Sequence, residues 1–205
     1  MTDDWRVEPA RAEHEGALLE LYARNEIACH CQYWHFAGDK NEWQNRLAHE
    51  PDKNAAALTA DLQTGRAEGL VALSGALVIG WLKLARAENL PKLYEQRLYR
   101  ALPCFGGDRS GILAVGCLLI DEAFRRRGVA RALIRASVDA ARARGARAVE
   151  AFPRGQLELA DAEAWTGPIS AFVQAGFRVV NDFRPYPVMR HDLTPARNPA
   201  EPIED

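Results

Sequence analysis

The spacing of apolar and polar side chains changes across a basic loop at residues 125–130. Residues 111–120 form an almost unbroken apolar run, which predicts a buried strand. Beyond the loop, apolar residues recur at helical spacing over 130–141 with arginines on the opposite side, and Gly145 supplies a stop signal. Residues 146–153 predict a second strand, closed by Pro153. Together they predict a right-handed βαβ crossover with the loop at the carboxyl end of its first strand, where ligands of α/β sheets bind.

The same patterns divide the rest of the chain into short elements. Strands are predicted at 5–8, 70–73, 76–85, 177–182 and 186–193, and helices at 10–25, 41–50, 53–64, 91–102 and 165–175. One domain over residues 1–193 is expected for a chain of 205 residues. The tail 194–205 carries three prolines and few apolar residues, so we expect it to be disordered.

The loop between the strand and the helix has the composition of an anion-binding site. Arg125, Arg126 and Arg127 supply positive charge, and Gly128 lets a ligand approach the backbone closely. The first turn of the helix adds unpaired N–H groups and the positive end of the helix dipole. The alternative is an exposed helix start whose arginines are simply solvated. The Walker and dinucleotide glycine motifs are absent, so we expect a phosphate ligand other than a nucleoside triphosphate or NAD.

Three motifs in a fixed order resemble those of the GNAT N-acetyltransferase superfamily. The loop 125–130 resembles the family's acetyl-CoA-binding motif, Arg/Gln-x-x-Gly-x-Gly/Ala, and the usual apolar strand stands before it at 118–120. Residues 172–177 are similar to the family's Tyr-x-x-x-Gly-Phe, and residues 77–82 to its hairpin strand. The resemblance covers roughly residues 70–193.

The resemblance implies an α/β (α+β) fold, a single GNAT-like domain with a mixed, mostly antiparallel central sheet of about seven strands flanked by helices. A V-shaped split between strands four and five would hold the pantetheine arm of acetyl-CoA. The implied donor-binding residues are Leu118, Leu119, Ile120, Arg125, Arg126, Arg127, Gly128, Val129, Ala130 and Arg131. Two residues depart from the family pattern. Arg126 stands where the family often has Gly, and Phe172 stands where many members have a Tyr that protonates the leaving thiolate.

By the same resemblance, we expect an acyl-CoA-dependent N-acetyltransferase that moves an acetyl group from acetyl-CoA to an amine of a small acceptor. Direct attack in a ternary complex is the expected mechanism, and an aromatic, acid-containing pocket would suit a small cationic amine. One alternative is an acyl-CoA-binding or sensing module without turnover, which the Phe172 replacement favours. The other, nucleic-acid binding by the arginine-rich helix, is disfavoured by the net charge of −2.

Composition narrows the expected setting. With 48% hydrophobic and 26% charged residues, the chain has the composition of a soluble globular protein, and no apolar run is long enough to span a membrane. The N-terminus lacks the apolar region of a signal peptide, and four cysteines do not make a disulfide scaffold. We therefore expect a cytoplasmic protein without a nucleic-acid or membrane partner or a metal ion. A homodimer is expected from the family resemblance alone.

Glu150 is the leading candidate for the general base that deprotonates the acceptor amine. It lies in the otherwise apolar strand 148–152, where a carboxylate is unusual unless it faces a partner, water or a site. This strand would be the fifth and would line the acceptor side of the split. The alternative is a salt bridge to one of the chain's many arginines.

Cys31 is the second catalytic candidate. It lies in a run of two cysteines, a histidine and aromatic residues over 29–35, and some uncharacterised GNAT proteins carry a similar Cys-x-Cys-x-x-Trp run. Three interpretations remain open: a core plug of thiols and rings, an acceptor-pocket lining in which Cys31 or Tyr33 donates a proton or Cys31 carries an acyl group, and a zinc site. The spacing favours the zinc site least, because no second Cys-x-x-Cys pair is present.

Packing explains the other conspicuous side chains. Cys117 lies in the apolar fourth strand, where a thiol packs like a small hydrophobic group. Trp165, Phe172 and Phe177 are expected in the core rather than in a substrate site. Tyr94, Tyr99 and Tyr186 are alternative proton donors, although packing of their amphipathic rings is the favoured role for each.

Overall fold

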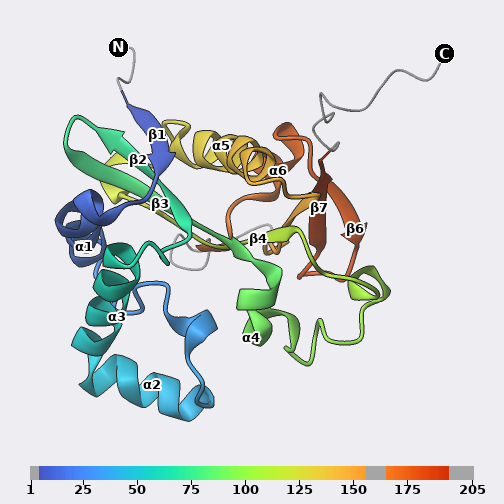
Figure 1. The fold of residues 1–205 in the computed structure, drawn as a ribbon, viewed down its shortest axis with the longest axis horizontal. Helices are drawn as coiled ribbons and strands as arrows, with labels where there is room; N and C mark the ends of the chain where they lie inside the picture. The colour runs from blue at the N-terminus through green and yellow to red at the C-terminus, as the bar shows by residue number, and fades with distance from the viewer. Residues whose placement is uncertain (1–4, 156–164, 194–205) are drawn as a thin grey trace.

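The computed structural model describes residues 5–155 and 165–193, which form a central sheet covered by helices (Figure 1). The strands are β1 (Arg6–Pro9), β2 (Gly69–Ser74), β3 (Leu77–Arg86), β4 (Ile112–Ile120), β5 (Ala148–Ala151), β6 (Arg178–Asn181) and β7 (Val188–Asp192). The α-helices are α1 (Glu15–Arg24), α2 (Lys40–His49), α3 (Pro51–Gln63), α4 (Pro91–Tyr94), α5 (Val129–Ala143) and α6 (Ile169–Gln174). The tail 194–205, for which disorder is expected, lies outside the described residues.

The sheet has the strand order β1-β2-β3-β4-β5-β7-β6. All neighbouring strands run antiparallel except β4 and β5, because α5 carries the chain across the sheet between them. The expected mixed, mostly antiparallel sheet of seven strands flanked by helices is confirmed. The split between strands four and five is confirmed as well, because the parallel pairing ends at Val115 and Ala151 while β4 continues to Ile120.

Side chains that alternate along the strands fill a core layer on each face of the sheet. Leu82 and Leu84 of β3 pack with the apolar stripe of α5 and with α6. Trp81, on the opposite face, packs with α1 and α3. Ala85 packs on that same face with α4 and with the short 3-10 helix η2 (Tyr33–His35). In Figure 1, α5 and α6 accordingly lie above the sheet and α1 to α4 below it.

The helix expected at 10–25 is α-helical only over Glu15–Arg24, after a 3-10 turn at Ala12–His14, and two further helices are also shorter than the sequence predicts. The helical segment expected at 91–102 ends at Tyr94 and continues as turns, because tertiary contacts hold the Tyr94 hydroxyl and the Tyr99 ring in place. The helix expected near 165–175 begins only at Ile169, because Gly167 has a φ of +83°, which a right-handed helix does not allow. In both places the local helix propensity gives way to side-chain contacts and backbone geometry.

Candidate functional site

The candidate site begins where β4 loses its parallel neighbour. Beyond Val115, no residue of β5 pairs with β4, so the backbone polar groups on that edge of β4 lack a strand partner among the described residues. A β-bulge lies at the same point, because Lys83 pairs with Cys117 and Leu84 with Val115, which leaves Gly116 as the extra residue. Bulges re-aim a strand and end its pairing, and they occur frequently beside active sites.

Trp34 fixes the backbone at this bulge. Its indole Nε1 donates a hydrogen bond of 2.8 Å to the Gly116 carbonyl oxygen, and its side chain is buried. A Cβ built on Gly116 would lie 3.2 Å from two atoms of the indole ring, so a side chain at this position would press against Trp34. The small residue and the tryptophan therefore define the shape of the strand where the split opens.

The basic loop leads from the end of β4 into α5. Asp121 accepts a hydrogen bond from the Ala123 backbone N–H, and Arg24 of α1 donates to its Oδ2 at 2.8 Å, so the strand end is anchored to a helix on the opposite face. Arg126 has a φ of +62°, in the left-handed region that favours glycine. The glycine that the family often has at this position therefore has a backbone explanation.

The N-terminus of α5 has the properties of an anion-binding site. Gly128 is the N-cap residue, with a φ of +91° and no side-chain hydrogen bond that would cap the helix. The backbone N–H groups of the first turn therefore have no capping side chain, and the helix dipole adds positive potential. A Cβ at Gly128 would meet the guanidinium of Arg131 at 3.3 Å. The absence of a side chain keeps this space open.

A groove of about 500 Å³ joins the end of β4, the loop and α6. Nine of the ten predicted donor-binding residues line it: Leu118, Leu119, Ile120, Arg125, Arg126, Gly128, Val129, Ala130 and Arg131. Arg127 instead lines an adjoining hollow with Arg131 and Arg135, and its guanidinium lies 5.4 Å from the centroid of the Phe124 ring. The predicted residues therefore gather around one basic groove and the hollow beside it.

A second cavity of about 400 Å³ lies on the α4 side of the same split. Val115 and Gly116 of β4 form one wall of this cavity. Phe152, Arg154 and Tyr186, which come from later parts of the chain, also line it. Trp34, Tyr99 and Trp165 complete an aromatic lining. Trp165 also lines the basic groove, so its side chain borders both spaces.

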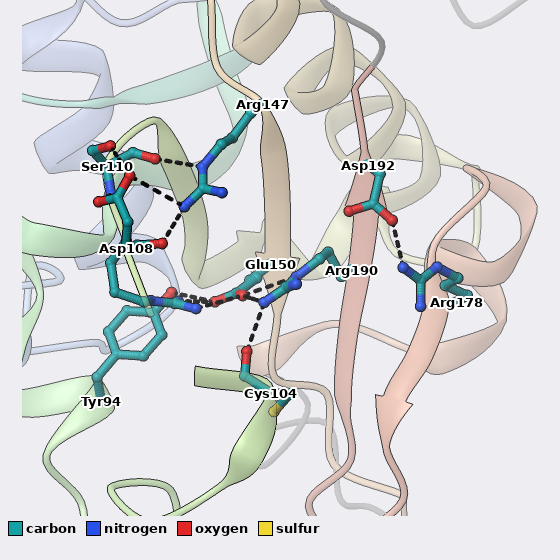
Figure 2. A network of polar contacts seen from close by, with 10 residues as sticks. Tyr94, Cys104, Asp108, Ser110, Arg147, Glu150, Arg178, Arg190 and Asp192 are labelled. Carbon is teal, nitrogen blue, oxygen red and sulfur yellow. Dashed lines mark hydrogen bonds and ion pairs between the residues drawn. The ribbon is translucent and has the colours of Figure 1, made fainter. Parts of the chain in front are cut away.

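Glu150 lies at the centre of a buried ion-pair network, shown in Figure 2. Its side chain is fully buried, and its two oxygens accept hydrogen bonds from Tyr94, Arg109 and Arg190. The shortest ion-pair distances are 2.5 Å to each arginine. Arg190 also donates to the Cys104 carbonyl oxygen at 2.8 Å, so the network joins β5 to β7, α4 and the 102–110 segment.

The salt-bridge alternative for Glu150 is therefore confirmed. Five hydrogen bonds reach its two oxygens, which fills the lone-pair positions that a general base would use to take a proton. Glu150 also does not line the groove or the aromatic cavity. These contacts give Glu150 a structural role, because they join β5 to the segments around the cavity.

Cys31 lies in the core beneath β3 and β4. It is 3% exposed and packs with Trp81, Tyr22 and Cys117, and the Trp81 Nε1–H points at its sulfur at 3.2 Å. The sulfur does not line the groove or the aromatic cavity, which agrees with the core-plug interpretation. Within the described ranges, this segment does not bring three metal-ligand atoms together.

The Cys31 thiol is nevertheless electrostatically unusual. Burial raises its pKa, but the Cys117 thiol, the Lys83 ammonium and the Trp81 indole stabilise the thiolate and bring the pKa down to about 7. The pKa of Cys117 is raised well above its usual value by the hydrogen bond to Cys31 and by burial. The pair therefore favours a thiolate on Cys31 and a protonated thiol on Cys117.

Three aromatic residues expected in the core separate into two kinds. Phe172 and Phe177 are buried, with ring centroids 5.2 Å apart, so the expectation is confirmed for both. It is wrong for Trp165, which is 42% exposed and lines both cavities. Gly167 and Pro168 prevent the helix from starting earlier, so the Trp165 ring lies ahead of α6. This Gly-Pro pair was the sequence signal for the exposed position of Trp165.

Arg154 and Thr166 carried no sequence signal, because they come from segments without a motif. Tyr99 and Tyr186, two of the alternative proton donors, line the same cavity. Trp34 was visible only as the last residue of the Cys-x-Cys-x-x-Trp run. In this run the tryptophan, rather than either cysteine, reaches the cavity.

Comparison with known proteins shows the same fold in several solved structures. The GNAT domain of S. lividans PAT aligns with a TM-score of 0.56 at 21% identity, covering 92% of this chain and 90% of that chain. YncA, a putative acetyltransferase from Salmonella typhimurium with its cofactor acetyl-CoA, gives 0.54 at 18% identity, covering 95% and 97%. PaiA N-acetyltransferase from Thermoplasma acidophilum in complex with coenzyme A gives 0.53 at 9% identity, covering 93% and 99%. At such low identities, the likeness establishes the fold alone.

Sequence comparison identifies the family. No curated protein matches the chain. Among the described residues, none of the helices has both the length and the apolar character that crossing a membrane requires. The family model of the acetyltransferase (GNAT) family matches residues 17–156, which include the split strands, the basic loop and the crossover helix, and the chain therefore belongs to this family.

Proposed function

We propose that this protein is an acetyl-CoA-dependent N-acetyltransferase that acts on the amine of a small molecule by direct attack in a ternary complex. The observation that carries the proposal is the parting of β4 from β5 after Val115. It opens a basic groove on one side and an aromatic cavity on the other, and Trp165 borders both. A donor and an acceptor bound in these two spaces would meet at the same stretch of β4.

The residues of the groove fit a diphosphate with an extended arm. The first-turn N–H groups of α5 and the guanidiniums of Arg125 and Arg131 would hold the diphosphate, and the open space at Gly128 lets it approach. The edge of Leu118–Ile120 that lacks a strand partner would hydrogen-bond the amides of the pantetheine arm. Arg127 and Arg135, in the adjoining hollow, would add positive charge for further phosphate.

The reaction forms one bond and breaks one. The acceptor nitrogen attacks the thioester carbonyl carbon, the carbon–sulfur bond breaks, and the sulfur leaves as a thiolate that takes up a proton. The lining described for the aromatic cavity contains neither a carboxylate nor a histidine, so we infer that the amine reacts in its neutral form after losing its proton to water. Phe172 has no proton to give and is buried, so water would also supply the thiolate's proton.

Glu150 and Cys31 act at a distance in this proposal. Glu150 fixes Tyr94, Arg109 and Arg190 and so positions the segment that carries Tyr99 and the cavity wall. Cys31 packs under the bulge, where Lys83 and Cys117 face each other across β3 and β4. Both are positioning residues rather than groups that touch the reacting atoms.

A turnover assay tests the proposal. Release of the coenzyme A thiol from acetyl-CoA is followed with a panel of primary amines, and the Gly128→Glu variant is measured beside Gly75→Glu. Both glycines have positive φ, but Gly75 has open space around it in the β2–β3 turn. Amine-dependent release that Gly128→Glu abolishes and Gly75→Glu retains supports the proposal. Equal loss in both variants, or no dependence on any amine, contradicts it.

The second candidate function is an acyl-CoA-binding module without turnover. The observation favouring it is the pairing of a buried Phe172 with a described cavity that offers no general base. Tight acetyl-CoA binding together with thiol release that no amine accelerates would establish this function in place of the transferase.

A further inference from the structure

We propose that Cys31 and Cys117 form a peroxide-reactive thiol pair, which closes to a disulfide bond between the 29–35 segment and the bulge of β4. Neither cysteine lines the basic groove or the aromatic cavity. The inference therefore goes beyond the proposed function and does not depend on it. The substrate class is a small hydroperoxide, for which hydrogen peroxide is the probe.

The fold brings the two sulfurs together from distant parts of the chain. Both side chains pack in the core layer that also contains Trp81, with exposed fractions of 3% for Cys31 and 9% for Cys117. The Cys117 thiol hydrogen-bonds the Cys31 sulfur. Two sulfurs at hydrogen-bonding distance need only a short displacement to reach the disulfide bond length of about 2.05 Å.

Polar groups that stabilise negative charge surround the Cys31 sulfur. The Trp81 indole N–H lies 3.2 Å from it, in addition to the Cys117 thiol. The Tyr22 hydroxyl is buried, has no other hydrogen-bond partner among the described residues, and stabilises a thiolate at the same sulfur. Lys83, which pairs with Cys117 across β3 and β4, adds the charge of a buried ammonium. Such surroundings favour a thiolate, which is the form that attacks a peroxide.

The backbone around Cys31 is unusual and lies outside the helices and strands. His30 and Cys31 have φ values of +44° and +55°, two consecutive residues in the left-handed region. Residues with side chains keep this conformation only where their surroundings hold it, and they cluster at functional and switch regions. The turn can therefore approach β4 while β4 stays paired with β3. Three residues further on, Trp34 donates to the Gly116 carbonyl, so a movement of the turn reaches the bulge.

The reaction consumes two thiols and one hydrogen peroxide. The Cys31 thiolate attacks one oxygen of the peroxide, the O–O bond breaks, and hydroxide leaves, which gives a sulfenic acid on Cys31. The Cys117 sulfur then attacks the Cys31 sulfur, the S–O bond breaks, and the departing hydroxide takes the Cys117 proton to form water. The two sulfurs together lose two electrons, and the peroxide is reduced to water.

Exposure and acidity predict different targets among the cysteines. Cys29 and Cys104 are more exposed than the proposed pair. Burial nevertheless raises the pKa of Cys104, and burial together with the neighbouring Cys31 raises the pKa of Cys29 to about 12. Near neutral pH, Cys31 therefore has the largest thiolate fraction of the three, although it is the most buried.

The test is oxidation of the full-length, reduced protein with hydrogen peroxide near neutral pH. Free thiols are then blocked with iodoacetamide, and peptides are mapped by mass spectrometry without reduction. A crosslink between Cys31 and Cys117 should form about tenfold faster than Cys104 is oxidised, and dithiothreitol should reverse it. Cys29→Ser, the control within the same turn, should keep the crosslink. In Cys117→Ala, the reaction should stop at a sulfenic acid on Cys31 that dimedone traps.

Each other outcome overturns the proposal. A crosslink through Cys29 or Cys104, or oxidation of Cys104 ahead of Cys31, shows that exposure rather than the thiol pair directs the reaction. Sulfenic or sulfinic acid on Cys31 beside a free Cys117 thiol in the wild type removes the second step. Four intact thiols after a treatment that oxidises the urea-unfolded chain remove the reaction altogether. The wild-type map gives these answers even where a variant fails to fold. Because the bond is identified from peptide masses, absence of transferase activity leaves its assignment unaffected.

Discussion

The two ends of the β4–β5 pair carry opposite kinds of polar chemistry. At the paired end, Glu150 is fully buried and every oxygen of its carboxylate is engaged by Tyr94 and two arginines. At the open end, β4 has no parallel partner within residues 5–155 and 165–193, α5 has no capping side chain at Gly128, and arginines line a groove. The contrast teaches that a charged residue in a strand is not by itself a sign of function. Polar groups with partners hold the fold, and polar groups without partners indicate where a ligand belongs.

The largest expected effect is at the paired end. Glu150→Gln leaves two partly buried guanidiniums without a counter-charge, so the free energy of unfolding should fall by about 3–5 kcal/mol. Urea unfolding measures the change. Asp192→Asn, which removes an exposed ion pair to Arg178, is the matched control and should have a much smaller effect.

The same variant tests whether Glu150 acts as a base. Under conditions where Glu150→Gln stays folded, the pH profile of kcat/KM should keep the shape of the wild-type profile. If Glu150→Gln keeps wild-type stability but its kcat/KM no longer falls at acidic pH, Glu150 acts as the general base.

The next effect is at the junction of the two ends. Trp34→Phe keeps a ring but removes the hydrogen bond to the Gly116 carbonyl, so kcat/KM should fall by about tenfold, while acetyl-CoA affinity should change less than twofold. Steady-state kinetics and calorimetry measure the two quantities. Trp43→Phe, a buried tryptophan that lines neither cavity, is the control. Unchanged kinetics in Trp34→Phe would mean that the bulge does not depend on this bond.

The Cys31 thiolate gives a spectroscopic prediction. Because its pKa is lowered to about 7 from an ordinary value of 9.0, the ultraviolet absorbance of a thiolate should appear as the pH rises through 7. Cys31→Ser should remove this step and Cys104→Ser should not. The sign for stability follows: the contribution of a lowered pKa is complete above pH 9 and is lost as the pH falls through 7. The advantage of wild type over Cys31→Ser should therefore grow from pH 7 to 9. A first titration step above pH 9 would contradict this.

The smallest effect concerns the loop backbone. Arg126→Gly relieves the left-handed conformation and should raise the free energy of unfolding by about 1 kcal/mol, measured by thermal melting. Acetyl-CoA affinity should fall only slightly, because Arg125 and Arg131 remain in the groove. A lower melting temperature in the variant would show that Arg126 makes contacts worth more than the strain.

Periodicity alone predicted the parts of the fold that local sequence determines. The crossover helix, its two strands and the hairpin were visible because apolar positions repeat at one spacing over many residues. The segment after Tyr94 was misjudged because distant contacts at Glu150 and Phe152 override its helix propensity. The partners of Glu150 were unreadable for the same reason, since Arg109 and Arg190 lie 41 and 40 residues away. The predicted residues of the basic groove all lie within 118–131, whereas the cavity draws on residues from six separate segments.

The most direct test of the account is a calorimetric titration of the wild-type protein and Gly128→Glu with acetyl-CoA. Binding at the open end predicts a dissociation constant on the order of micromolar for wild type, weakened at least a hundredfold by the carboxylate at the start of α5. Glu150→Gln, assayed while folded, should bind acetyl-CoA as wild type does. Wild-type binding that Gly128→Glu leaves intact, or no binding by wild type, would contradict the assignment of the groove.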